Sequence, residues 1–152
     1  MTLVPQTGEV VEVRPVSEDW PRLRARAERM RDLPVETPAE IDAALRQIEM
    51  LGFELADLLL HANEERYDAE VTHSRRKNAA LSKHGREQKS VTVARALAEL
   101  DAESELADWL AKKAVCHHIE SIVAALKAKH YGLMNTNKGI QGMTAIQHRR
   151  TA

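Results

Sequence analysis

The chain has few aromatic residues, a single cysteine and no long apolar run. Each of these shortages excludes a class of protein. Aromatic residues make up 3% of the 152 residues, so a bulky globular core is not expected. The single cysteine, Cys116, excludes an intramolecular disulfide framework and suits a reducing compartment. No apolar run reaches the length of a membrane span, and the N-terminus lacks the basic-then-apolar plan of a signal peptide. We therefore expect a cytoplasmic protein with no membrane partner.

Signatures of catalysis and of cofactor binding are also missing from the sequence. It contains no phosphate-binding glycine loop, no zinc-knuckle spacing and no nucleophile elbow. His61 with Glu64, and His117 and His118 with Glu120 beside Cys116, could meet across two helices as a metal site. Di-iron helical bundles, however, use the opposite order, Glu-x-x-His, on four helices. We expect a protein that is not an enzyme and that uses no metal and no cofactor.

What the chain does contain is alanine and charge of both signs. Apolar residues make up 43% of the sequence, and the abundance of alanine among them favours long helices in close contact. The 22 basic residues nearly balance the 23 acidic ones, which gives a net charge of −1. Because the whole chain is not basic, any indication of nucleic-acid binding must come from a local cluster.

A long amphipathic helix is predicted from residue 38 to residue 84. Thr37, Pro38 and Glu40 form a helix start with a capping box. Apolar residues then alternate in steps of three and four, as in a coiled coil: Ile41, Ala44, Ile48, Leu51, Leu55, Leu58 and Ala62. The same spacing continues through mostly polar residues, which predicts a weaker second half: Glu65, Ala69, Thr72, Arg76, Ala79 and Lys83. Gly85 to Lys89 is the predicted turn.

A second long helix is predicted from residue 91 to residue 131, with Ser90 as its cap and Gly132 at its end. One apolar seam comprises Val93, Leu97, Leu100, Ala107, Ala111 and Ala114, and another comprises Val115, Ile119, Ile122, Leu126 and Leu133. Trp109, Leu110 and Val123 lie outside both seams. One neighbouring helix cannot cover so much apolar surface, so we expect a homo-oligomer with these three residues at its interface.

The flanking segments complete an all-α fold. Residues 1–16 are expected to form an extended arm or a small hairpin. Residues 17–33 form a short helix, capped by Ser17 or Asp19, with a narrow apolar stripe comprising Trp20, Leu23, Ala27 and Met30. Residues 132–152 are expected to be a tail, either flexible or a short docked helix. Because a short turn joins the two long helices, residues 37–131 are predicted to form a coiled-coil-like antiparallel hairpin roughly 60–70 Å long.

A basic block at the predicted turn is the clearest charge feature, and an acidic block follows it: Arg75, Arg76, Lys77, Lys83, Arg86 and Lys89, then Glu99, Asp101, Glu103, Glu105 and Asp108. Folding the hairpin near residue 87 brings Arg75 and Arg76 opposite Glu99, and Arg66 opposite Asp108. One interpretation is interhelical pairing that fixes the register. The other is that the basic tip contacts phosphate, although no aromatic side chain is near to stack on bases. The arginines on the outer face of the N-terminal helix are a second candidate for anion binding.

Two features stand out at the ends of this pattern. The chain opens with Leu3-Val4-Pro5-Gln6-Thr7-Gly8-Glu9-Val10-Val11, and Tyr67, Ala69 and Glu70 come late in a long helix that ends in a basic tip. In these two features the chain resembles small helical proteins of phages of high-GC Gram-positive bacteria. This resemblance implies an accessory of DNA replication or recombination that acts in the host cytoplasm. The expected function is thus a non-enzymatic interaction protein that binds nucleic acid through Lys83, Arg86 and Lys89, with Arg75 and Arg76 beside them. The alternative is a protein-only binder of a host or phage protein, either an anti-defence or regulatory factor or a structural assembly component.

Overall fold

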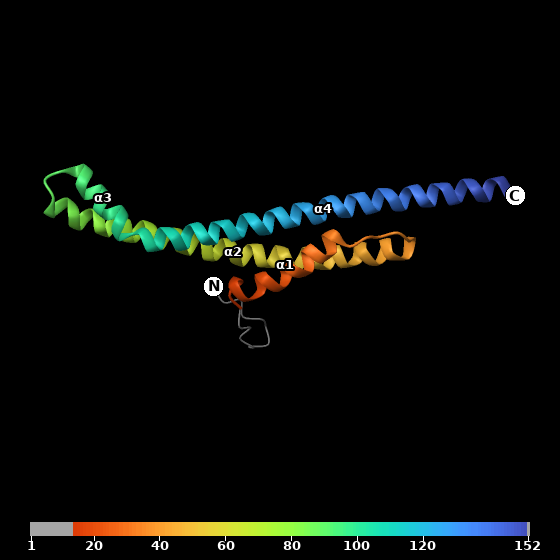
Figure 1. Cartoon of the computed structure of the whole chain (residues 1–152), viewed down its shortest axis with the longest axis horizontal. Helices are drawn as coiled ribbons and strands as arrows, with labels where there is room; N and C mark the ends of the chain where they lie inside the picture. Colours follow the sequence, from red (N-terminus) through yellow and green to blue (C-terminus); the bar gives the residue numbers. More distant parts are fainter. Residues whose placement is uncertain (1–13, 152) are drawn as a thin grey trace, which may run out of the picture.

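The computed structural model describes the backbone of residues 14–151 and the side chains of residues 14–147, and over this range the chain is all-α. The helices are α1 (Val16–Asp32), α2 (Pro38–Glu87), α3 (Val91–Asp101) and α4 (Glu103–Thr151). Figure 1 shows α2 running antiparallel to α3 and α4, with α1 packed on the half of this hairpin that lies away from the turn. The predicted fold class, a long helical hairpin with a short N-terminal helix, is confirmed. Residues 1–13 of the predicted arm lie outside the described range.

The start of α2 has the capping box that the sequence predicts. The Thr37 hydroxyl accepts a hydrogen bond from the Glu40 backbone N–H at 3.3 Å, and the Glu40 carboxylate accepts from the Thr37 N–H at 2.9 Å. All seven residues of the apolar seam from Ile41 to Ala62 are buried. The first half of the seam is therefore confirmed residue by residue.

In the second half of α2, Ala69 is buried as predicted, but the later positions of the predicted seam are not. Thr72, Arg76, Ala79 and Lys83 are exposed, whereas the buried positions are Ala69, Ala80 and His84. A straight α-helix has 3.6 residues per turn, so a strict seven-residue repeat drifts around its surface. Without large apolar side chains to hold the repeat in phase, the inward face has moved on by one residue.

The return helix is interrupted at Ala102, contrary to the prediction of one continuous helix over residues 91–131. In α3, Val93 and Leu100 are exposed, and the buried seam consists of Ala94, Ala98 and Ala102. Leu97, the other large residue of the predicted seam in α3, is half-buried. Ala107, Ala111 and Ala114 of the predicted first seam are also exposed. The second seam is confirmed, since Ile119 and Leu126 are buried and Val115, Ile122 and Leu133 pack against the same core.

The return helix also continues past its predicted end at Tyr131. Gly132 does not stop α4, which runs to Thr151 and extends beyond the N-terminal end of α2 (Figure 1). Asn137 Nδ2 donates to Asp42 Oδ1 at 3.2 Å, and the Thr136 hydroxyl donates to the Gly132 carbonyl within the helix. The Asn137–Asp42 contact continues the α2–α4 packing past the glycine, so the first part of the predicted tail belongs to the hairpin.

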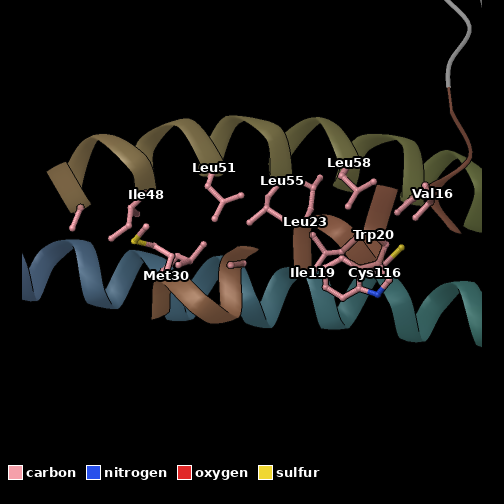
Figure 2. Packing of buried hydrophobic residues seen from close by; sticks show 14 residues of the cluster. Val16, Trp20, Leu23, Met30, Ile48, Leu51, Leu55, Leu58, Cys116 and Ile119 are labelled. Carbon is pink, nitrogen blue, oxygen red and sulfur yellow. The ribbon is translucent and has the colours of Figure 1, made fainter. Parts of the chain in front are cut away.

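The core lies where α1 crosses the hairpin. Figure 2 shows Trp20, Leu23 and Met30 of α1 between the seam of α2 and the side chains of α4. The predicted stripe of α1 is confirmed as buried, but its predicted cap is wrong, because α1 begins at Val16 and not after Ser17 or Asp19. No side chain of α1 caps the helix. Instead, the Val16 N–H donates to Glu65 Oε1 of α2 at 3.1 Å.

Two polar contacts hold α1 in place. The Arg26 guanidinium makes a bidentate pair with the Glu54 carboxylate of α2, at 2.6 and 2.9 Å. At the other end of the helix, Lys129 Nζ of α4 donates to the carbonyls of Met30, Arg31 and Leu33 at 2.7, 2.8 and 2.5 Å. These carbonyls lie in the last turn of α1 or just after it, where they lack partners within the helix. No helix in the described range is both long enough and apolar enough to span a membrane.

Candidate nucleic-acid interface at the hairpin tip

The tip of the hairpin, residues 83–95, is closed by a polar contact between α2 and α3. His84 is 9% exposed, and its Nε2 donates to Asp101 Oδ2 at 2.9 Å. This hydrogen bond, with the neighbouring positive charges, holds the pKa of Asp101 below its ordinary value. The Gln88 N–H donates to the His84 carbonyl at 2.8 Å and so ends α2. Ser90 occupies the predicted cap position of α3, but its side chain makes no capping hydrogen bond.

Two cations of the basic block pair with the acidic block on the facing helices. Lys77 Nζ lies 3.1 Å from Glu99 Oε1. Arg76 Nε donates to the Asp101 carbonyl at 3.2 Å and lies 3.9 Å from the Glu105 carboxylate. Interhelical pairing therefore exists, but its predicted register is wrong. Glu99 pairs with Lys77 in place of Arg75 or Arg76, because the turn lies at residues 88–90.

The predicted pair of Arg66 with Asp108 is also not formed. The Asp108 carboxylate instead pairs within α4, at 2.8 Å from Lys112 Nζ. The Arg66 guanidinium lies over the Tyr67 ring, 4.4 Å from its centroid. The Arg66 guanidinium and the Asp108 carboxylate each interact with a side chain of their own helix, so neither contributes to the interhelical register.

The remaining cations near the tip are exposed and form no ion pair or hydrogen bond within the described part of the chain: Arg75, Lys83, Arg86, Lys89 and Arg95. Arg95 was not singled out by the sequence analysis, although it comes only one turn after the start of α3. Residues 83–95 contain a single acid, Glu87, whose carboxylate lies 3.6 Å from His84 Nδ1. The tip thus presents unpaired positive charge on a turn between two helix ends.

The three residues predicted for an oligomer interface do not share one exposed surface. The Trp109 ring stacks on His73 of α2, with centroids 5.6 Å apart and an interplanar angle of 21°. Val123 is half-buried and packs against the hydrophobic core. Only Leu110 is largely open to solvent, with 50% of its surface exposed. The three residues therefore differ in exposure, and an interface that contains them stays a prediction.

The candidate metal ligands do not gather into a cluster. No group of three or more histidine, cysteine, aspartate or glutamate side chains that could hold a metal ion occurs among the described residues. His117 Nδ1 lies 3.2 Å from Glu120 Oε2 on the exposed side of α4. Cys116 is buried in the core beside Trp20 (Figure 2), and burial raises the pKa of its thiol. This cysteine is a packing residue.

Comparison with known proteins gives no match to any protein-family model, to any curated protein or to any solved structure. The hairpin tip must therefore be interpreted from its own charges and geometry.

Proposed function

We propose that this chain is a non-enzymatic accessory protein that binds the phosphate backbone of nucleic acid through its hairpin tip. The observation that carries the proposal is the set of exposed cations at Lys83, Arg86 and Lys89, which form no ion pair or hydrogen bond among the described residues. Arg75 and Arg95 extend this surface along α2 and α3. Arg76, which the sequence analysis included, is held by Asp101 and Glu105 and is assigned to the hairpin register.

The chemistry of the tip predicts how it binds. Lysine and arginine pair with phosphate oxygens and displace condensed counterions, so affinity falls steeply as salt rises, with a slope of about 0.9 per phosphate neutralised on duplex DNA. Residues 83–95 include no aromatic side chain that could stack on an unpaired base. Binding should therefore be independent of base sequence and should not require single strands. Together with the resemblance to phage helical proteins, this supports a phage-encoded accessory of replication or recombination in the host cytoplasm.

The test is charge reversal at the tip, measured by fluorescence anisotropy with a labelled DNA duplex over a salt series. We expect Lys83→Glu, Arg86→Glu and Lys89→Glu in one chain to abolish binding, because each replaces a phosphate contact with a repulsion. The matched control reverses three exposed cations away from the tip and from α1, Arg46, Lys113 and Lys138, and so changes net charge equally. The control should bind as the wild type does.

Two results would contradict this proposal in different ways. If the wild type binds no DNA at low salt, the nucleic-acid function is wrong. If the tip variant binds normally, the contact lies elsewhere, and the arginines on the outer face of α1 become the candidates. Circular dichroism should show the same helix content in all three proteins, since none of the altered side chains is buried.

A protein-only binder is the second candidate, favoured by the apolar side chains on the outer face of α2. Phe53, Leu60 and Tyr67 follow one another at intervals of seven residues and are 77%, 59% and 58% exposed. Such a stripe suits a partner helix better than a polyanion. A protein that only binds protein would show no salt-dependent affinity for DNA, so the same anisotropy experiment separates the two functions.

A further inference from the structure

An apolar groove lies between α2 and α4 on the side of the hairpin that α1 does not cover. Its volume is about 500 Å³, and its walls include Leu59 of α2 and Val123 and Leu126 of α4. No residue of α1 lines it. Glu54, which pairs with Arg26 of α1, lies between Gly52 and Ala56 of the groove in the sequence of α2. Residues two apart point to nearly opposite sides of a helix.

Gly52 lines the α2 side of the groove. A Cβ atom built on this residue would meet nothing within 4 Å. Glycine inside a helix costs about 1 kcal/mol of stability relative to alanine. Within the described part of the chain, the groove is therefore open at Gly52.

Phe53 stands at the edge of the same groove. It is the only phenylalanine of the chain and is 77% exposed, more than any other large apolar residue described. A two-fold interface uses the same surface on both copies, so that surface must carry both a protruding group and a hollow that receives it. Phe53 and the groove meet this requirement, because they lie side by side on one face of the hairpin.

The two rims of this face carry opposite charges that are not paired within the described part of the chain. Lys127 of α4 lines the groove and is exposed. Asp57 does not line the groove, but it is exposed on α2 one turn after Phe53, which does. A two-fold axis parallel to the helices lays α2 of one copy on α4 of the other. In that arrangement Asp57 meets Lys127 of the second copy, whereas α2 lying on α2 would bring acidic side chains together.

We propose that this face is a homodimer interface in which Phe53 of each copy enters the α2–α4 groove of the other. Asp57 of one copy pairs with Lys127 of the other and selects the arrangement. Of the three residues that the sequence indicates for self-association, Val123 belongs to this interface, and Trp109 and Leu110 do not. The inference does not depend on nucleic-acid binding, because the groove and the tip involve different residues.

Sedimentation equilibrium of the full chain tests the interface. We expect the wild type at micromolar concentration to have twice the monomer mass of 17.1 kDa. Phe53→Asp should raise the dissociation constant at least about 30-fold, as loss of a central aromatic anchor usually does. Leu100→Asp is the matched control, since Leu100 is 65% exposed on α3 and lies outside the groove. This control should remain dimeric.

A charge exchange tests the orientation. Asp57→Lys should weaken the dimer because two like charges then meet, and adding Lys127→Asp in the same chain should restore it. A wild-type monomer at tens of micromolar, or a Phe53→Asp variant that dimerises as the wild type does, would overturn the proposed interface. If the double exchange fails to restore the dimer, the arrangement of α2 on α4 is wrong. Unchanged thermal melting of a monomerised variant at low concentration would show that the hairpin itself remains folded.

Discussion

Leu55 and His84 are both buried on α2, yet they stabilise their parts of the hairpin in different ways. Leu55 is fully buried among apolar side chains of three helices. His84 instead holds the tip through a hydrogen bond to Asp101, where the packed neighbours are alanines. The contribution of Leu55 is the removal of a large apolar side chain from water. The contribution of His84 depends on the geometry of one polar contact.

Replacing Leu55 by alanine should therefore be far more damaging than the same change in the polar half of α2. We expect Leu55→Ala to lower the free energy of unfolding by about 2–5 kcal/mol, because it leaves a cavity in the core. Leu81→Ala, at a half-buried position near the tip, should cost much less. Leu60→Ala, five residues from Leu55 but 59% exposed, should have almost no effect. Urea denaturation of the three variants measures the difference, and similar losses for all three would contradict the seam.

The sequence predicts which residues are buried in the first half of α2 but, apart from Ala69, not in the second half. From Ile41 to Ala62 large apolar side chains define one face of α2, and every predicted position is buried. Beyond Ala62 the choice between neighbouring positions depends on alanines, which fit either face. The burial of Ala80 and His84, and of Ala94 and Ala98 across from them, is decided by how closely the backbones approach. The periodicity of apolar residues does not contain that information.

At the scale of helices, α1 is attached by side chains from its neighbours more than by its own caps. Lys129 of α4 donates to three carbonyls in or just after its last turn, and Glu65 of α2 accepts from its first N–H. Burial lowers the pKa of the Lys129 ammonium group, and the nearby Asp32 carboxylate opposes that effect. Only the protonated form of this group can donate to all three carbonyls.

Removing the Lys129 contact should loosen the end of α1. We expect Lys129→Met to lower the free energy of unfolding by about 1–3 kcal/mol, because three carbonyls at the end of α1 lose a charged donor while the alkyl chain remains. Hydrogen exchange should become faster in α1 and stay unchanged in α3. Lys138→Met, at an exposed position of the same helix, is the control and should behave as the wild type. Equal protection of α1 in all three proteins would show that apolar packing alone holds this helix.

The bounds of the helices were predictable only where a terminal signal acts alone. The capping box at Thr37 begins α2 as expected, since nothing competes with it. Gly132 fails as a stop signal because α2 continues to supply partners to α4 beyond it, including Asp42 for Asn137. The interruption at Ala102 has no signal in its own sequence. It follows from the packing of a short alanine-lined helix on the end of α2.

For the molecule as a whole, stability should depend on acid pH. The pKa of Glu54 is lowered by hydrogen bonds from Arg26 and by the charges of Arg26 and Arg22, against the effect of burial. Hydrogen bonds likewise lower the pKa values of Glu40, Asp101 and Glu105. A carboxylate whose pKa is lowered by folding stabilises the protein above its ordinary pKa, near 4.5 for glutamate. That contribution is lost as the pH falls through the lower value in the folded state.

The Glu54→Gln variant isolates one of these groups. We expect it to melt at a lower temperature than the wild type at neutral pH, because it lacks the paired carboxylate. Below about pH 4.5 the wild type should lose stability more steeply, so the two melting curves converge in acid. Glu64→Gln, at an exposed position of α2, should follow the wild type throughout. A constant difference between Glu54→Gln and the wild type at all pH values would show that the Arg26 contact does not depend on ionisation.

The candidate site was predictable as a cluster but not in its membership. The sequence places Lys83, Arg86 and Lys89 at the turn, and the structure places them there as exposed side chains. The sequence alone could not assign Arg76 and Lys77 to pairs with the facing helices. The register of those pairs depends on the position of the turn and on the interruption at Ala102. Arg95 was overlooked because it adjoins the acidic block in the sequence, although in the structure it follows the turn by one helical turn.

Because α1 covers only one half of the hairpin, the molecule has two regions that can open at different free energies. The half with three helices contains the large apolar residues, so its amides should exchange only through nearly global unfolding. The tip has two helices, alanine contacts and one histidine–aspartate hydrogen bond, and can open locally at a much smaller cost. A polyanion that binds at the tip would therefore contact a segment that can change its conformation while the core stays folded.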